Sequence, residues 1–127
     1  MSEVVLDASA LMAVLREEPG AVEVEALLDA AAISAVNLSE VQAKLVERGT
    51  PAASAWSWLV GLELEVIGFD VAQARVAGDL RAPTLSRGLS LGDRACLALA
   101  QLLDRPAVTA DRAWAGLDVG IEIRTIG

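Results

Sequence analysis

The chain has 127 residues, of which 54% are hydrophobic and 22% charged, and this composition predicts one folded domain spanning residues 1–127. It contains no histidine and no tyrosine, so imidazole-based catalysis, including the Ser-His-Asp triad, and zinc sites of the common Cys/His type are excluded. The net charge of −8 argues against a protein that binds nucleic acid through its overall charge.

The N-terminal segment, MSEVVLDAS, lacks the features of a targeting sequence. A glutamate stands where a signal peptide needs positive charge, and the apolar run is too short for an h-region. No run approaches the length of a membrane span. The single cysteine, Cys96, cannot form an intrachain disulfide, which suits a reducing compartment. We therefore expect a cytoplasmic protein with no membrane segment.

The first half of the chain predicts helices that alternate with short strands. A dense run of Val and Leu at 3–6 indicates a strand, and the helix that follows over 9–16 is stopped by EEPG. Apolar residues at helical spacing predict a second helix over 21–31, and AIS at 32–34 indicates a short buried strand. A third helix is expected over 38–48, where a glycine follows.

The second half continues this alternation. Pro51 begins a helix in which Trp56 lies on the apolar face and is expected in the core, whereas Trp58 falls off that face. The remaining expected elements are a strand in LEVIGF (64–69), a helix from the cap Asp70 to about Arg81, a loop in APTLSRGLS (82–90), the longest apolar helix (90–103), and strands in AVTA (107–110) and IEIRTI (121–126).

This order of elements predicts an α/β fold. Its central sheet should be mostly parallel, with four to five short strands and with helices on both faces. The strands are apolar throughout rather than alternating, as is typical of strands buried on both sides. In such sheets, binding sites form at the carboxyl ends of the strands, near the point where the strand order reverses.

Four acidic residues occupy equivalent places along this pattern. Asp7 and Asp111 each end a strand, whereas Glu40 and Asp93 each lie in the first turn of a helix that follows the sheet edge. We expect all four at one rim of the sheet. Four carboxylates that converge there would repel one another, and either protonation or a cation would relieve that repulsion.

Helix capping is an alternative explanation for each of these acids. The pairs Asn37–Glu40 and Ser90–Asp93 have the spacing of a capping box. Asp7 and Asp111 are good N-cap residues where a strand turns into a helix. Capping accounts for any one acid, but it does not explain why all four should lie at one rim.

A hard divalent cation is the functional alternative. Carboxylate oxygens without histidine favour Mg²⁺ or Mn²⁺ over zinc. One or two such ions can activate water for attack on phosphorus and can neutralise the leaving oxygen. The adjoining helix N-termini would assist in binding phosphate.

The chain resembles the PIN-domain family, most closely the VapC-type toxins of bacterial toxin–antitoxin pairs, in four ordered segments: VVLDASAL (4–11), NLSEV (37–41), LSLGDRACLALA (89–100) and VTADRAW (108–114). This resemblance covers essentially the whole chain. It implies a PIN-like three-layer α/β/α sandwich and an endoribonuclease that depends on one or two Mg²⁺ or Mn²⁺ ions.

The resemblance also implies which residues form the site. The residues that match the family's four acidic metal-binding and catalytic positions are Asp7, Glu40, Asp93 and Asp111. Ser9 matches its small hydroxyl position, and we expect Ser9 and Thr109 to support the acids or to contact phosphate. Arg94 and Arg112 each follow a site acid, and we expect them to form ion pairs with neighbouring carboxylates; contact with RNA phosphate is the alternative.

Three partners follow from the resemblance: an RNA substrate, a VapB-type antitoxin and a second copy of the chain in a homodimer. Trp58 is a candidate for a dimer or antitoxin contact, with an ordinary half-buried tryptophan as the alternative. Two bound Mg²⁺ ions would change the net charge from −8 to −4, so RNA affinity must come from the metals and from local arginines. A basic antitoxin segment would suit the acidic groove.

Two other functions compete with that of an endoribonuclease. A non-catalytic PIN module would bind a partner or RNA without cutting it, although an intact set of four acids argues against it. Other acid-rich α/β enzymes fit less well. In haloacid-dehalogenase phosphatases a second Asp follows the first by two residues, where this chain has Ser9. A receiver domain needs an acidic pair after the first strand and a lysine after the fifth, and this chain has neither.

Overall fold

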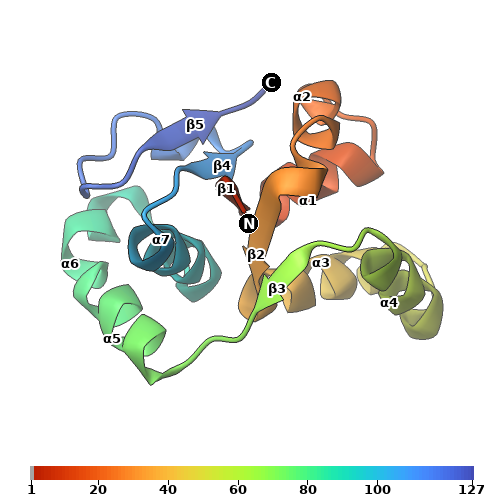
Figure 1. Cartoon of the computed structure of the whole chain (residues 1–127), viewed down its shortest axis with the longest axis horizontal. Helices are drawn as coiled ribbons and strands as arrows, with labels where there is room; N and C mark the ends of the chain where they lie inside the picture. The colour runs from red at the N-terminus through yellow and green to blue at the C-terminus, as the bar shows by residue number, and fades with distance from the viewer. Residues whose placement is uncertain (1) are drawn as a thin grey trace.

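The computed structural model describes residues 2–127, in which five strands form one all-parallel sheet between layers of helices (Figure 1). The strands are β1 (Val4–Leu6), β2 (Ala31–Ser34), β3 (Glu65–Ile67), β4 (Ala107–Thr109) and β5 (Ile123–Thr125). Their spatial order is β3-β2-β1-β4-β5, and every neighbouring pair is parallel. The predicted α/β fold with a parallel sheet and helices on both faces is confirmed.

The helices account for most of the remaining chain. They are α1 (Ala8–Leu15), α2 (Ala21–Glu25), α3 (Ala35–Glu47), α4 (Ala52–Gly61), α5 (Val71–Asp79), α6 (Arg81–Thr84) and α7 (Leu91–Leu103), with short 3₁₀ turns η1 (Leu28–Ala30), η2 (Leu85–Arg87) and η3 (Arg112–Trp114). The three central strands are buried along their whole length, as their uniformly apolar sequences predict, whereas the edge strands β3 and β5 are mostly exposed.

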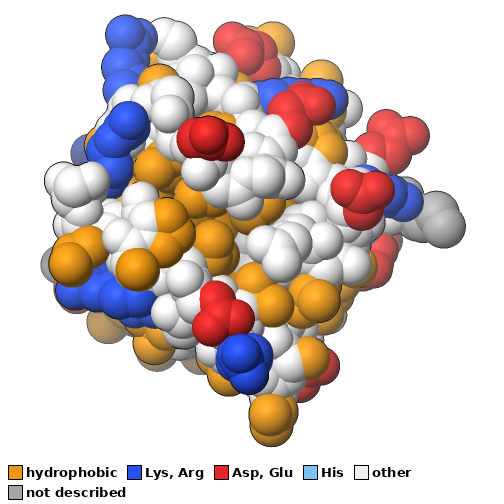
Figure 2. All heavy atoms as spheres, turned by 90° about the vertical axis from the view of Figure 1, so that its left-hand side faces the viewer, with side chains coloured by type: hydrophobic (Ala, Val, Ile, Leu, Met, Phe, Trp, Pro, Cys, Tyr) orange, Lys and Arg blue, Asp and Glu red, His pale blue; other side chains and the backbone are white. Residues whose placement is uncertain are grey.

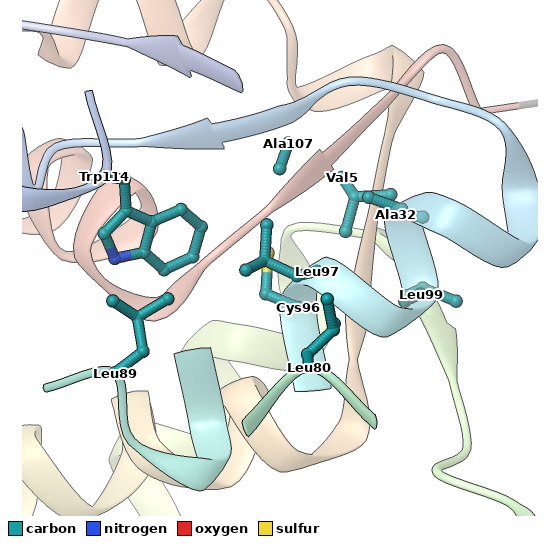
Figure 3. Close-up of a cluster of buried hydrophobic side chains, with 10 residues drawn as sticks. Val5, Ala32, Leu80, Leu89, Cys96, Leu97, Leu99, Ala107 and Trp114 are labelled. Carbon is teal, nitrogen blue, oxygen red and sulfur yellow. The ribbon is translucent and has the colours of Figure 1, made fainter. Parts of the chain in front are cut away.

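One face of the sheet is covered by α7, with α5 packed against it. Val5 and Ala107 from adjacent central strands form a buried cluster with Cys96 and Leu97 of α7 and with the indole of Trp114 (Figure 3). Trp114 is the largest fully buried side chain in residues 2–127. The indole of Trp114 therefore packs the segment that follows β4 against this face of the sheet.

The opposite face is covered by α1 and α2. Val4 and Leu6 point to this side, where they form a buried cluster with Ala10 of α1 and Val24 of α2. Neighbouring strand residues project to opposite faces, so β1 supplies Val5 to one core and Val4 and Leu6 to the other. By the same alternation, the residue after Leu6 projects toward the α7 face.

The strand order reverses between β1 and β4, and this is where the sheet positions a site. The chain runs from β1 through β2 to β3 on one side, then crosses to β4 and β5 on the other. Leu6 is paired with Val108, so residues 7 and 109 come side by side at the carboxyl edge. The Asp7 amide donates to the Val108 carbonyl at 3.1 Å, which continues the pairing one residue further. Such reversal points are where ligands bind in open α/β sheets.

Two regions of the chain differ in kind of structure from those expected. The predicted helix over 21–31 ends at Glu25, because Ala31 pairs with Val4 in the sheet and the chain must extend before it. The predicted loop over 82–90 contains α6 and η2 instead. Pro83 is compatible with α6 because it lies in the first turn, where backbone N–H groups have no partner within the helix.

The prediction that Trp56 lies in the core is wrong. Its side chain is 45% exposed, and the buried positions of α4 are Ala55 and Leu59, one helical turn apart. Since α4 packs mainly on α3, only this narrow stripe is covered. Trp58 is 37% exposed, and its suggested role in a dimer or antitoxin contact stays a prediction.

Hydrophobic side chains also reach the surface elsewhere. Figure 2 shows the side of the molecule on which α5 and α6 lie, with hydrophobic atoms across its middle and charged groups around them. The exposed apolar residues of the elements on this side include Val71 and Leu85. Within residues 2–127, no helix is both long enough and apolar enough to cross a membrane.

Replacement of Trp114 should destabilise the protein far more than replacement of Trp56. Trp114→Ala removes a fully buried indole and should lower the free energy of unfolding by about 3–5 kcal/mol. Trp56→Ala, the matched control, should lower it by about 1 kcal/mol or less, because that side chain is already half in water. Urea unfolding followed by circular dichroism measures both, and equal losses would contradict the assignment of Trp114 to the core.

Candidate active site at the β1–β4 edge

Asp7 is the centre of the site and is almost fully buried, with 3% of its surface exposed. It follows β1 and caps α1, since its Oδ1 accepts from the Ala10 amide at 2.8 Å. The Ser9 hydroxyl donates to the same carboxylate, 2.8 and 2.9 Å from its two oxygens. Thr109 Oγ1 donates to Oδ2 at 2.5 Å from the neighbouring strand. The predicted N-cap role of Asp7 is confirmed, and the predicted hydroxyl residues Ser9 and Thr109 both contact it.

The same hydroxyls tie the end of β4 to the start of α1. The Ala110 amide donates to Ser9 Oγ at 2.9 Å, and the Asp111 amide donates to Thr109 Oγ1 at 3.0 Å. Parallel pairing places residues 7 and 109 next to each other, so a carboxylate on one strand meets a hydroxyl on the next. The hydrogen bonds therefore hold the Asp7 carboxylate in one orientation and fix the chain that leads to Asp111.

Burial raises the pKa of Asp7 to about 6, from an ordinary value of 3.8. The hydrogen bonds from Thr109, the Ala10 amide and Ser9 act in the opposite direction, because they favour the charged form. The negative charge of Asp93 adds to the rise. Desolvation is the largest cause, so a group that brings positive charge to this carboxylate would stabilise its ionised form.

Asp93 lies on α7 and takes part in a capping box with Ser90. Its Oδ2 accepts from the Ser90 amide at 2.9 Å, and the Asp93 amide donates to Ser90 Oγ at 3.2 Å. The predicted capping box is confirmed. In the structure the cap engages one of the carboxylate oxygens that a metal would need, while the charge of Asp93 still acts on Asp7.

Glu40 is held beside the N-terminus of α7 by Asn37. The Asn37 side-chain amide donates to Glu40 Oε1 at 2.8 Å and to the Gly92 carbonyl at 2.9 Å. A methyl group on Gly92 would overlap the Glu40 carboxylate. The Asn37 amide holds Glu40, and the absence of a side chain at Gly92 leaves room for it, so Glu40 lies against the turn that carries Asp93.

This arrangement corrects the predicted Asn37–Glu40 capping box. The helix begins at Ala35 rather than at Leu38, and Ser34 is its N-cap, with Oγ accepting from the Val36 amide at 3.2 Å. Asn37 therefore lies inside the first turn of α3, only 1% exposed, and its Oδ1 has no hydrogen-bond partner. Its side-chain amide donates both to Glu40 of the same helix and to the Gly92 carbonyl of α7, and Ser34 rather than Asn37 caps the helix.

The negative charges of Asp7, Glu40 and Asp93 all act on the buried thiol of Cys96. Burial raises the pKa of Cys96 well above its usual value, and the negative charges of these three acids raise it further. Cys96 is fully enclosed, so the thiol is inert packing one turn below Asp93. Three of the four predicted acids thus lie within electrostatic reach of one buried thiol, and their use as metal ligands stays a prediction.

Asp111 is exposed and lies at the outer side of the site. It caps η3, its Oδ1 accepting from the Ala113 amide at 2.9 Å, which confirms its predicted N-cap role. Its connection to Asp7 runs through Thr109. In residues 2–127, no group of three or more Asp, Glu or Cys side chains is arranged to hold a metal ion. The four-carboxylate metal site therefore stays a prediction.

Arg94 and Arg112 do not form the expected ion pairs. Arg94 Nη1 donates to the Ala77 carbonyl of α5 at 2.9 Å, and its buried Nε has no partner. Arg112 Nη2 donates to the Gly127 carbonyl at 3.0 Å. Each guanidinium thus donates to a backbone carbonyl of another segment rather than to the adjacent acid. Contact of either residue with RNA stays a prediction.

Two residues of this site, Asn37 and Gly92, are not evident from sequence as positioning residues. Asn37 has the spacing of a cap, and Gly92 is one glycine in a helix start. Their role depends on the approach of α3 to α7, which joins residues 55 positions apart. A glycine in the first turn of an otherwise alanine- and leucine-rich helix is the one local sign of a close contact.

Comparison with known proteins places the chain among PIN domains. The PIN-domain family model matches residues 4–119. Chains of solved structures resemble this one at high coverage of both chains: VapBC2 of Rickettsia felis bound to promoter DNA (20% identity, TM-score 0.75, 98% and 98%), VapBC-5 of Mycobacterium tuberculosis (25%, 0.68, 98% and 98%) and the sarcin–ricin loop cleaving toxin VapC20 of M. tuberculosis (17%, 0.70, 91% and 96%). No curated protein matches the sequence.

Gly92→Ala should displace Glu40 while leaving the fold intact. The new methyl group meets the end of a flexible side chain, so we expect the free energy of unfolding to change by less than about 1 kcal/mol. Affinity for Mn²⁺, measured as the rise in melting temperature with added metal, should fall about tenfold. Gly78→Ala in α5 is the matched control, because no atom lies within 4 Å of its added methyl group. Unchanged Mn²⁺ affinity in Gly92→Ala would contradict this role.

Stability of the metal-free protein should depend on the protonation of Asp7. The raised pKa of Asp7 means that the folded state favours its neutral form, so its contribution is complete below about pH 4 and is lost as pH rises through 6. Relative to Asp7→Asn, the wild type should lose on the order of 3 kcal/mol across this range. Urea unfolding in EDTA at several pH values measures the difference, and parallel pH profiles would contradict it.

Proposed function

The chain belongs to the PIN-domain family, and on this premise we propose that it is a metal-dependent endoribonuclease, the toxin of a toxin–antitoxin pair. The observation that carries the proposal is the buried Asp7 carboxylate, held by Thr109 and Ser9 at the strand-order reversal with Glu40 and Asp93 nearby. Buried acids with raised pKa values are typical of functional sites rather than of surface caps.

The donor set fits a hard divalent cation. The side chains that converge offer oxygen atoms, and the one sulfur nearby, on Cys96, is enclosed in the core. Asp7, Glu40, Asp93 and Asp111 would hold one or two Mg²⁺ or Mn²⁺ ions. When bound, such an ion supplies the positive charge that activates water and stabilises the leaving oxygen of a phosphodiester.

Neighbouring residues of the chain hold the acids of the site in position. Thr109 and Ser9 donate to Asp7 and keep both of its oxygens at fixed positions. Asn37 donates to Glu40 and keeps it beside α7. Hydrolysis at such a site adds water across a P–O bond of RNA and leaves 5′-phosphate and 3′-hydroxyl ends.

Above about pH 6 Asp7 is ionised and able to bind a cation, which predicts activity at neutral pH.

The partners proposed here follow from the same premise. Two of the similar structures come from VapBC systems, and we propose that a VapB-type antitoxin inhibits this chain and that the chain forms a homodimer. VapC20 cleaves the sarcin–ricin loop, which supports RNA as the substrate class here. The cytoplasm is the compartment where such a substrate is available.

A non-catalytic PIN module that binds RNA or protein is the second candidate. One observation favours it: carboxylate oxygens of Asp93 and Asp111 accept hydrogen bonds from their own helix starts, which compete with a metal. Binding of RNA by the purified protein without cleavage in Mg²⁺ or Mn²⁺ would support this alternative.

Cleavage of total RNA by the antitoxin-free protein tests the proposal. We expect cleavage in Mg²⁺ or Mn²⁺, none in EDTA, and a loss of at least about 100-fold in Asp7→Asn and in Asp93→Asn. Asp70→Asn is the matched control, because Asp70 caps α5 as Asp7 caps α1, its Oδ1 accepting from the Gln73 amide at 2.9 Å. Cleavage that persists in EDTA or in Asp93→Asn would overturn the mechanism.

A further inference from the structure

A groove between α1 and α3 leads away from the candidate active site. It encloses about 390 Å³, and its lining includes Ser9, Met12, Arg16, Lys44, Arg48 and Ala110. Ser9 belongs to both features, because its hydroxyl donates to Asp7 and also accepts from the Ala110 amide. The groove therefore borders the hydroxyl that holds the buried carboxylate.

Both walls of this groove present positive charge. Ser9, Met12 and Arg16 follow one another at helical spacing along one side of α1, and Lys44 and Arg48 are one turn apart at the end of α3. Lys44 is the only lysine of the chain. Cations from two separate helices thus face one space that borders Ser9 of the candidate site.

The positive charge is only partly neutralised. Two acids, Glu18 and Glu47, also line the groove. Arg16 lies 3.5 Å from Glu18, but both side chains are nearly half exposed, so this pair is weak and readily exchanged. Within residues 2–127, no ion pair holds Lys44 or Arg48. Three cations against two acids give a local charge of +1 in a chain whose net charge is −8.

Helix stabilisation alone does not account for this arrangement. Lys44 and Arg48 lie at the C-terminal end of α3, where positive charge is favourable to the helix dipole. Any exposed orientation of the two side chains would stabilise the helix dipole equally well. It does not require them to face Arg16 of another helix, or to line a space that ends at Ser9.

We propose that this groove binds backbone phosphates of the RNA strand beside the scissile bond, with Lys44, Arg48 and Arg16 as the contacts. The inference rests on the proposed ribonuclease function and specifies where an acidic protein holds its substrate. Flexible cations that lack tight partners are suited to phosphates of any sequence. The groove contacts the strand outside the reacting atoms, so it contributes to affinity and not to the chemical step.

The test compares two double variants with the same change in net charge. Lys44→Gln/Arg48→Gln removes two groove cations, and Arg75→Gln/Arg124→Gln removes two exposed arginines that pair with Asp79 and Glu122 elsewhere. The probe is a labelled single-stranded RNA, with affinity measured in EDTA over a series of salt concentrations. KM and kcat for its cleavage are measured in Mg²⁺ or Mn²⁺.

The groove variant should bind RNA about tenfold more weakly at low salt, and its salt dependence should flatten by about 1.4 in the log–log slope, for two lost phosphate contacts. Its KM should rise while kcat stays within about twofold. The control variant should change both affinity and KM by less than about twofold. Equal losses in the two variants, or no loss in the groove variant, would overturn the proposal.

Other outcomes separate this inference from the proposed function. A groove variant that loses affinity for the antitoxin but not for RNA would assign the groove to a protein partner and overturn the RNA assignment. If the wild type cleaves RNA and the groove variant binds RNA normally, the ribonuclease function is supported but the groove does not bind its substrate. Specific loss of RNA binding without any cleavage by the wild type would support the groove and contradict the ribonuclease.

Discussion

The structure depends on the burial of one carboxylate at the end of its central strand. A buried, ionised carboxylate costs several kcal/mol unless hydrogen bonds or a cation compensate. Asp7 receives three kinds of donor: a helix amide, the Ser9 hydroxyl and the Thr109 hydroxyl. These donors are available because β1 and β4 are parallel neighbours in a fixed register. A one-residue slip would direct the acid to the other face of the sheet and would separate it from Thr109.

The opposite wall of the site is set by α7, whose apolar body and polar start serve different purposes. Cys96 and Leu97 anchor the helix in the core beside Trp114, so the first turn cannot move far. That turn carries Asp93 in a capping box and Gly92 against Glu40. A metal bound at Asp93 would compete with the cap for Oδ2, which accepts from the Ser90 amide. Loss of the cap would cost about 1 kcal/mol of helix stability. This is less than the free energy that a divalent cation would gain from binding a carboxylate.

Local patterns in the sequence were sufficient to predict the parallel sheet, its buried central strands and the caps at Asp7, Asp70 and Ser90, because each depends on residues close in the chain. Trp56 was placed wrongly because helical spacing does not show how much of a face its neighbours cover. The links from Asn37 to Gly92 and from Thr109 to Asp7 span 55 and 102 residues. Such links follow only from the register of the strands and the approach of two helices.

The position of charge matters more than its sum in this protein. A net charge of −8 argues against an RNA-binding surface if charge is spread evenly. Here Asp7, Glu40 and Asp93 gather their negative charge at one edge, where a cation would convert the same residues into an attraction for phosphate. Exposed cations line the groove beside Ser9. With metal bound, the edge would no longer repel the strand that the groove attracts, whereas without metal the negative charge of the edge opposes that attraction.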